Sequence, residues 1–239
     1  MSAALASADL LARFEQAEPL PQRYGVGLDE RVVEYPWVLG QRPHGRVLDA
    51  GSALNHAHVL DRFLPAVADL HIVTFAPEPV SFPERGVSYV YADLRELPFP
   101  DGSFDAIVSI STLEHVGMDN SRYGGSPSGR DDPKDALQAA VSELKRVLTP
   151  GGMFLATVPY GQPEDHGWFR QFGREDVGEL IDALDLRRLA VYSYSPRGWQ
   201  LSSLEAARNE RYHALSDPPA YEPDLAAAAR AVVCLRAER

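Results

Sequence analysis

Residues 97–116 have the sequence LPFPDGSFDAIVSISTLEHV, and this stretch indicates the fold of the chain most directly. Pro100, Asp101 and Gly102 form turns readily. Residues 106–110 are mostly apolar and partly β-branched, as in a parallel strand that helices cover on both faces. Polar side chains follow the strand, and open α/β sheets bind their ligands at the carboxyl ends of their strands. The stretch therefore predicts a buried strand and a functional site at its end.

The composition narrows the class of protein. The chain has 239 residues with a hydrophobic content of 45%, which is enough for one large α/β domain with a real core. The formal net charge of −11 argues against nucleic acid as a partner. The single cysteine, Cys234, excludes an internal disulfide framework, and its apolar neighbours predict a buried thiol. We recognise no membrane span and no targeting segment, and we expect a cytoplasmic protein.

Strand and helix patterns alternate along the rest of the chain. Short apolar runs predict strands at 46–51, 70–75, 87–91, 153–158, 188–194 and 229–235. Helical spacing predicts helices at 56–64, 134–148 and 174–184, and residues 202–225 look irregular or partly helical. The turn formers at 149–152 end the second of these helices. This alternation predicts an α/β fold with a doubly wound, mainly parallel sheet.

The N-terminal residues form a separate lead-in to this pattern. Residues 2–18 carry Ala and Leu at helical spacing, and prolines stop the pattern directly afterwards. A second short helix is expected over 29–39, with a break at Pro36, because proline cannot donate a helical hydrogen bond. We assign residues 1–45 to an N-terminal helical cap and residues 46–239 to the main domain.

Four short motifs, at 47–51, 92–94, 97–107 and 147–152, follow one another in the order and spacing of a known family. Together they resemble the motifs of class I S-adenosylmethionine-dependent methyltransferases of the type 11 kind. The resemblance implies a Rossmann-like sheet of seven mainly parallel strands, with an antiparallel last strand and helices on both faces. It also implies S-adenosylmethionine as the cofactor. Residues 116–125 resemble a bacterial subgroup associated with glycan and polysaccharide biosynthesis.

The resemblance also implies which residues hold the cofactor. The loop after the first strand takes the amino-acid end, and Asp93 accepts a hydrogen bond from the adenine amine. The full set that we expect is Asp49, Gly51, Ser52, Ala53, Thr74, Asp93, Leu94, Ser109 and Ser111. The alternative for Asp49 and Asp93 is a plain role as turn residues at strand ends.

The chain departs from the family pattern at two places. The family's Gly-x-Gly-x-Gly is here GSALN at 51–55, which keeps only the first glycine. The family's second strand ends in an acidic residue that binds the ribose hydroxyls, and the corresponding strand here ends near Thr74. In this chain Thr74 is therefore the candidate to bind the ribose hydroxyls, or Glu78 if its side chain reaches back to them.

Two histidines compete for the role of general base. His115 follows the strand at 106–110, and its imidazole can take a proton near neutral pH; the alternative is a histidine that bonds backbone and shapes the pocket. His166 is the second candidate. The acceptor-binding residues that we expect are Glu114, Asp119, Tyr123, Tyr160 and Arg170. Some quinone-pathway O-methyltransferases hold a divalent ion with a Glu at the position of Ser111, so we expect no metal here.

These observations favour one function over two others. The leading hypothesis is O-methylation of a small polar or sugar-like acceptor, either a small molecule or a glycan, by an enzyme for which a homodimer is the candidate oligomer. The first alternative is a non-catalytic binding module that keeps the methyltransferase fold. The glycine motif, of which only the first glycine is kept, supports this alternative. The second is a nicotinamide-dependent sugar oxidoreductase or epimerase, which predicts Gly-x-Gly-x-x-Gly after the first strand, a motif that is absent there.

Overall fold

The fold is built on one large sheet, as seen in a computed structural model that describes residues 1–121, 132–213 and 228–239. The eight strands lie in the order β3-β2-β1-β4-β5-β10-β8-β9. Their bounds are β1 (Arg46–Ala50), β2 (Asp69–Thr74), β3 (Val87–Tyr91), β4 (Phe104–Ile110), β5 (Leu148–Pro159), β8 (Asp185–Ser195), β9 (Gly198–Ser202) and β10 (Ala231–Glu238). The neighbours from β3 to β5 pair in parallel, whereas β10 is antiparallel to both β5 and β8. The mainly parallel sheet with an antiparallel last strand is thus confirmed, and β9, which no sequence pattern predicted, extends one edge.

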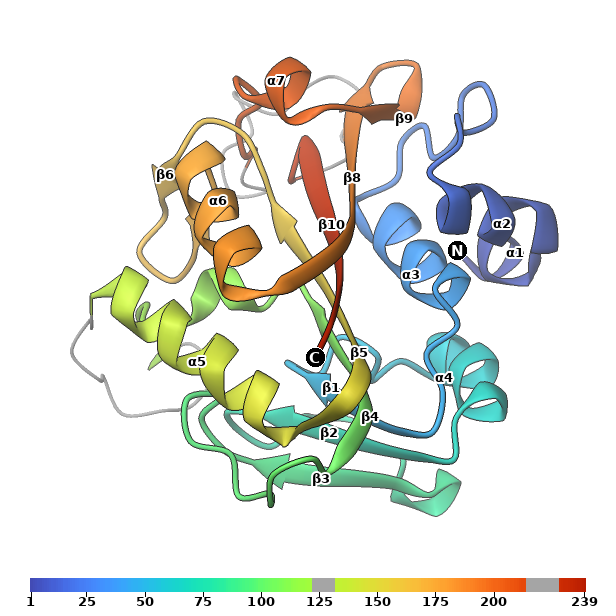
Figure 1. The fold of residues 1–239 in the computed structure, drawn as a ribbon. Coiled ribbons are helices and arrows are strands. Elements are labelled where there is room, and N and C mark those ends of the chain that lie inside the picture. Colours follow the sequence, from blue (N-terminus) through green and yellow to red (C-terminus); the bar gives the residue numbers. More distant parts are fainter. Residues whose placement is uncertain (122–131, 214–227) are drawn as a thin grey trace.

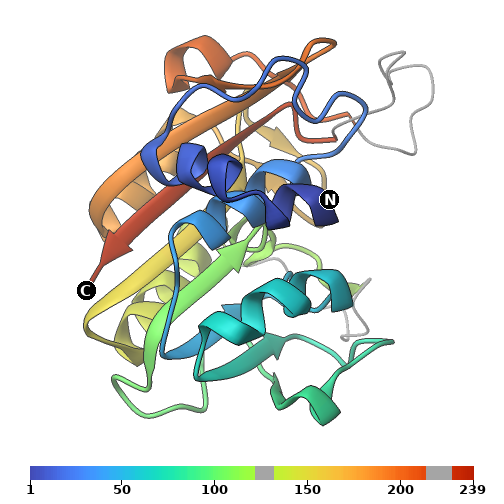
Figure 2. The same cartoon turned by 90° about the vertical axis from the view of Figure 1, so that its right-hand side faces the viewer.

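Helices cover both faces of the sheet, as expected. In Figure 1, α5 and α6 lie on one side of the strands and α1 to α4 on the other; Figure 2 shows the N-terminal helices in front of the sheet. Each face has its own buried apolar cluster. The helices are α1 (Ser2–Ala6), α2 (Ala8–Gln16), α3 (Arg31–Gly40), α4 (Ala57–Phe63), α5 (Pro133–Val147), α6 (Arg174–Ala183) and α7 (Leu204–Ala207). Short 3-10 turns and a small hairpin complete the elements: η1 (Leu64–Ala66), η2 (Pro83–Arg85), η3 (Leu113–His115), β6 (Glu164–Asp165) and β7 (Arg170–Gln171).

Helix α5 forms where its sequence predicts it. Asp132 caps the first turn, its carboxylate accepting from the backbone N–H groups of Lys134 at 2.9 Å and Asp135 at 3.2 Å. The apolar residues that recur at three- and four-residue spacing along this helix are its buried face: Ala136, Leu137, Ala140, Val141, Leu144 and Val147. The following strand, however, begins at Leu148 rather than at 153. The turn formers at 149–152 thus belong to the irregular start of β5, where its pairing with β4 shifts in register.

The expected break at Pro36 is wrong, because α3 continues through that residue. A proline inside a helix leaves the carbonyl four residues earlier without its usual donor. Here that carbonyl belongs to Val32, and the Tyr24 hydroxyl donates to it at 2.6 Å. A side chain from outside the helix therefore replaces the missing backbone hydrogen bond. Without that contact, the Val32 carbonyl would lack a donor, and the helix would be expected to break at Pro36.

The N-terminal pattern at 2–18 forms two helices instead of one. Ser7 separates them, and its hydroxyl caps α2 by accepting from the N–H of Leu10 at 3.3 Å. Both helices pack against α3, and the apolar residues of all three belong to the same buried cluster as one face of the sheet. None of the helices in the described part of the chain has the length and apolarity needed to cross a membrane.

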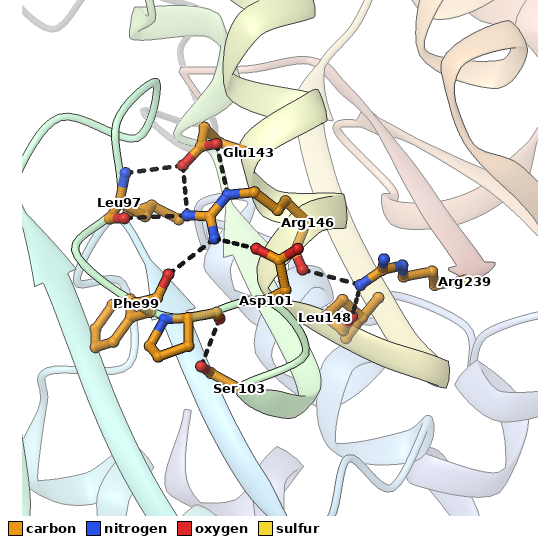
Figure 3. A network of polar contacts seen from close by, with 9 residues as sticks. Leu97, Phe99, Asp101, Ser103, Glu143, Arg146, Leu148 and Arg239 are labelled. Carbon is orange, nitrogen blue, oxygen red and sulfur yellow. Dashed lines mark hydrogen bonds and ion pairs between the residues drawn. The ribbon is translucent and has the colours of Figure 1, made fainter.

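Arg146 of α5 holds the turn before β4 in place (Figure 3). Its guanidinium donates to the carbonyls of Leu97 at 3.1 Å and Phe99 at 2.9 Å, and to the Asp101 carboxylate at 2.7 Å. Glu143, one helical turn earlier, pairs with Arg146 at 2.8 Å and accepts from the N–H of Leu97 at 3.0 Å. The stretch 97–116 thus enters the sheet from a turn that α5 fixes by charge-assisted hydrogen bonds.

Candidate active site

A cavity of about 380 Å³ lies at the carboxyl ends of β1, β2 and β4. Its volume is within the range that small-molecule sites usually have. Helix α3 and the β6–β7 hairpin supply further walls through Arg31, Tyr35 and Trp168. Eight of the residues expected from the sequence line it: Gly51, Ser52, Ala53, Thr74, Asp93, Leu94, Ser111 and His115.

The loop after β1 has the backbone geometry of a close ligand approach. Gly51 has a φ of +125°, and a Cβ added there would lie 2.0 Å from Oγ1 of Thr112. Asp49 does not line the cavity but lies fully buried beneath this loop. Its Oδ2 accepts from the N–H of Leu54 at 2.8 Å, while Oδ1 has no hydrogen-bond partner among the described residues. Asp49 therefore shapes the loop from below.

Both departures from the family pattern have a structural explanation. Asn55, which stands where the family has its last glycine, donates to the carbonyl of Val80 at 2.8 Å and accepts from the Tyr89 hydroxyl at 2.7 Å. Its side chain thus joins the loop to the segment after β2. In that segment Glu78 reaches back to the cavity, where it accepts from the Ser52 hydroxyl at 2.5 Å. A carboxylate is therefore present at the edge of β2, although the strand itself ends in Thr74.

Asp93 lies in the cavity wall with its carboxylate already engaged. Arg95 donates to Asp93 through its backbone N–H at 2.9 Å, its Nε at 3.0 Å and its Nη2 at 2.6 Å. Burial acts to raise the pKa of Asp93, but these hydrogen bonds outweigh it, so the pKa lies below its ordinary value. The group is an ionised acceptor that a ligand would share with Arg95.

Of the two candidate bases, His115 lines the cavity. Its Nδ1 lies 2.9 Å from the carbonyl oxygen of Trp168. A carbonyl oxygen can only accept, so Nδ1 carries the hydrogen and the basic lone pair of the neutral ring is on Nε2. The imidazole also packs against the Trp168 ring, with 4.9 Å between the ring centres. Of the two roles weighed from the sequence, the backbone-bonded histidine is observed, and the role of base stays a prediction.

Several expected site residues lie away from the cavity lining. His166 stacks on Phe169 with 4.5 Å between ring centres, and it lies 3.4 Å from the Glu164 carboxylate. Tyr160 is fully buried and donates to the carbonyl of Leu204 at 2.9 Å. Arg170 pairs with Asp176 at 2.6 Å in a groove beside α6.

The remaining expected residues have other surroundings. Ser109 is buried in β4, where its hydroxyl donates to the carbonyl of Ala50 at 3.2 Å. Glu114 is also buried, and burial raises its pKa well above the ordinary value. Asp119 is absent from the lining and donates its backbone N–H to Gly167 at 3.1 Å. Tyr123 lies outside the described residues.

Arg31 and Tyr35 are cavity residues that no motif indicated. They lie one helical turn apart on α3, and the Tyr35 hydroxyl donates to the carbonyl of Ala53 at 2.9 Å. The only signal for them was the expectation that an N-terminal helix caps the crevice. In the described ranges, no group of three or more His, Cys, Asp and Glu side chains is arranged to hold a metal ion.

The buried Asp49 makes stability pH-dependent. Burial raises its pKa to about 7, despite the hydrogen bonds from Leu54 and Ala53. Because the folded pKa lies above the unfolded one, the folded state binds more protons between pH 4 and 7. The free energy of unfolding should therefore fall as pH rises through this window, by about 3 kcal/mol from this group.

The measurement is denaturant unfolding of wild type and Asp49→Asn at pH 4.5, 6 and 7.5. We expect a flatter pH profile for Asp49→Asn, while Asp182→Asn, a change at an exposed position of α6, should keep the wild-type profile. Parallel profiles for wild type and Asp49→Asn would contradict this account of the buried carboxyl.

Comparisons with known proteins identify the domain. A sequence profile described as "Methyltransferase domain" matches residues 50–156. Sterol 24-C-methyltransferase ERG6B of Gibberella zeae is 29% identical over 143 residues, which are 55% of this chain and 33% of that protein. The chain spans between 17% and 33% of the length of the first three relatives that it matches.

Solved structures share the fold at low sequence identity. The 1,6-didemethyltoxoflavin-N1-methyltransferase of Burkholderia thailandensis, solved with S-adenosylhomocysteine, is 16% identical with a TM-score of 0.51, and the match covers 99% of this chain and 88% of that one. The cyclase SpnF is 18% identical with a TM-score of 0.53, and the match covers 99% of this chain and 93% of that one. These likenesses concern the fold alone. The profile match shows that residues 50–156 are a methyltransferase domain, and the solved structures show that the chain shares its fold with proteins of this kind.

Proposed function

We propose that the protein transfers a methyl group from S-adenosylmethionine to a hydroxyl oxygen of a small polar or sugar-like acceptor, with His115 as the general base. When bound, S-adenosylmethionine supplies an electrophilic methyl group on a sulfonium sulfur. The contribution of the chain is to bind both molecules, to orient them and to accept the acceptor's proton.

The cavity suits this cofactor on three structural grounds. Gly51 keeps the loop after β1 free of a side chain, so that backbone N–H groups can approach a ligand. Glu78 and Asp93 are carboxylates in the wall, suited to accept hydrogen bonds from ribose hydroxyls and from an adenine amine. Leu94 and Phe75 offer apolar contacts for a flat ring. We therefore assign the amino-acid end to residues 51–53.

The observation that carries the catalytic part is the orientation of His115. Its Nδ1–H donates to the Trp168 carbonyl, so the basic nitrogen of this cavity-lining ring is Nε2, which lies 4.0 Å from Oε1 of the buried Glu114. In this role Nε2 takes the proton from an acceptor hydroxyl, so that the oxygen becomes the better nucleophile. The hydrogen bond to Trp168 then orients the ring and stabilises the resulting imidazolium.

The acceptor class is inferred from the cavity wall around His115. Asn120, Trp168 and Met118 line this part, and the Asn120 amide nitrogen is held by the carbonyls of His115 and Met118 at 3.2 and 3.1 Å. The amide oxygen of Asn120 and the Thr112 hydroxyl are suited to a polar acceptor. The resemblance of residues 116–125 to a glycan-associated subgroup points the same way.

The proposal is tested by a screen of hydroxylated small molecules and sugars with methyl-labelled S-adenosylmethionine. Mass spectrometry of the products should show the label on oxygen. A product methylated on nitrogen or carbon would contradict the assigned atom. A folded sample that binds no S-adenosylmethionine at millimolar concentration would contradict the function itself.

Replacement of Asp93 by alanine tests the adenine site. We expect S-adenosylmethionine binding to weaken by about 10- to 100-fold, the usual cost of losing a hydrogen bond to a charged group. Calorimetric titration measures it. The matched control is Asp182→Ala, which removes a carboxylate at an exposed position of α6 away from the cavity lining and should bind as well as wild type. Unchanged affinity of Asp93→Ala would show that adenine binds elsewhere.

A further inference from the structure

An ion pair on α3 supplies the cavity with a guanidinium that the motifs do not account for. Arg31 lines the cavity, and its Nη1 donates to Oε2 of Glu34 at 2.5 Å. Within the described residues Glu34 is the hydrogen-bond partner of this guanidinium, so the donors on Nε and Nη2 stay available. The Arg31 side chain is 32% exposed, whereas that of Glu34 has no exposed surface. One end of the pair is therefore fixed in the protein and the other faces a ligand space.

Glu34 is held by more than Arg31. Its Oε1 accepts from the hydroxyl of Ser111 at 2.6 Å and from the hydroxyl of Thr157 at 2.6 Å. A fully buried carboxylate is costly unless it is paired and hydrogen-bonded, and here it has one cationic and two hydroxyl donors. These contacts tie α3 to the ends of β4 and β5. Glu34 thus fixes the position of the Arg31 guanidinium relative to the sheet.

The loop after β1 lies in the same part of the cavity as Arg31. Tyr35, one helical turn after Arg31, donates to the carbonyl of Ala53, which connects α3 directly to this loop. Residues 51–53 and Arg31 line one continuous space. The guanidinium therefore shares a cavity with the segment that we assign to the amino-acid end of the cofactor.

Two other buried carboxyl groups near Arg31 add little negative charge. Burial, followed by the field of Glu34, raises the pKa of Glu30 to about 7. Burial raises the pKa of Glu114 well above its ordinary value. Both shifts favour the neutral form of the acid. Glu34 offsets the charge of Arg31, so what the guanidinium offers a ligand is its remaining N–H donors.

We propose that Arg31 binds the α-carboxylate of the cofactor's amino-acid portion and that Glu34 is the positioning residue that holds it there. The inference rests on the proposed function, because it names one contact of the same site. A guanidinium matches a carboxylate with parallel N–H donors and forms charge-assisted hydrogen bonds to it. A carboxylate could also come from an acceptor, and the two sources are separated by using cofactor analogues alone.

The test compares two ligands that differ in the carboxylate. S-Adenosylhomocysteine carries the amino-acid portion, and 5′-methylthioadenosine lacks it while keeping adenine, ribose and thioether. For Arg31→Met we expect S-adenosylhomocysteine binding to weaken by about 10- to 100-fold in calorimetry. Binding of 5′-methylthioadenosine should be nearly unchanged. The control Arg62→Met, at an exposed position of α4, should change neither affinity.

Two further variants test the positioning role. Glu34→Gln removes the charge that orients Arg31, and it should weaken S-adenosylhomocysteine binding selectively, by less than Arg31→Met does. Arg31→Met leaves the Glu34 carboxylate buried without its cation, which could destabilise the protein. The double variant Arg31→Met/Glu34→Gln also removes the carboxylate charge, so it repeats the binding test without an unpaired buried charge. Thermal unfolding confirms that each variant is folded.

The outcomes separate the inference from the proposed function. Unchanged S-adenosylhomocysteine affinity in Arg31→Met would overturn the inference and point to a carboxylate of the acceptor. Equal losses for both ligands would also overturn it, because a merely structural arginine affects both. Failure of the wild-type protein to bind either ligand would overturn the proposed function itself.

Discussion

Replacement of His115 by alanine is expected to lower kcat by about 10²- to 10⁴-fold, the usual contribution of a positioned general base. The affinity for S-adenosylhomocysteine should stay nearly unchanged, because the proposed role of the ring is toward the acceptor's proton. The measurements are turnover with the acceptor found in the screen and calorimetry with S-adenosylhomocysteine. The ratio of the two effects distinguishes a base from a residue that only shapes the cavity.

A second variant keeps the hydrogen bond that orients the ring. His115→Asn retains an N–H donor for the Trp168 carbonyl but has no basic nitrogen. It should be about as slow as His115→Ala. His166→Ala is the matched control, since His166 stacks on Phe169 away from the cavity lining, and it should keep most of the activity. Full activity in His115→Asn would exclude His115 as the base.

Much of the fold follows from local patterns in the sequence. The strand at 104–110 and the stripe of α5 are periodic over their whole length, so their type and buried face were predictable. The continuation of α3 through Pro36 was not, because it depends on a hydroxyl from Tyr24, eight residues before the carbonyl it bonds. Strand β9 was missed for a similar reason. It is a short edge strand whose one partner among the described strands is β8, and such pairing leaves little local pattern.

The candidate site also contains residues that local sequence patterns predict and residues that depend on distant contacts. The motif residues at strand ends lie together because parallel strands deliver their carboxyl ends to one edge. Ser109 and Tyr160 stand in or beside the same strands, yet both side chains are buried within the fold, so that position near a strand end does not decide exposure. Arg31 reaches the cavity through contacts with Glu34, and Glu34 in turn meets Ser111 and Thr157, which are 77 and 123 residues further along the chain. No local pattern contains such contacts.

Replacement of Gly51 by alanine is expected to abolish measurable cofactor binding. The added Cβ would lie 2.0 Å from Thr112 Oγ1 and 2.4 Å from its Cγ2, and no real Cβ tolerates such contacts. The backbone at φ +125° also disfavours any side chain. Either Thr112 or the loop must move, and both line the cavity, so the space for the ligand changes. Calorimetry with S-adenosylmethionine and a thermal melt would separate lost binding from lost folding.

Two control variants separate the causes by which Gly51→Ala can weaken cofactor binding, namely backbone strain and contact with Thr112. Gly86→Ala imposes an L-residue at a φ of +81° with no atom within 4 Å of the new Cβ, so it measures backbone strain alone and should leave cofactor binding intact. Gly51→Ala/Thr112→Gly removes the side chain that the new Cβ would strike, and it should recover part of the affinity. If Gly51→Ala binds as well as wild type, the loop after β1 is not where the cofactor approaches the backbone. If the double variant recovers nothing, backbone strain at Gly51, rather than contact with Thr112, explains why the first glycine of the motif is the one retained.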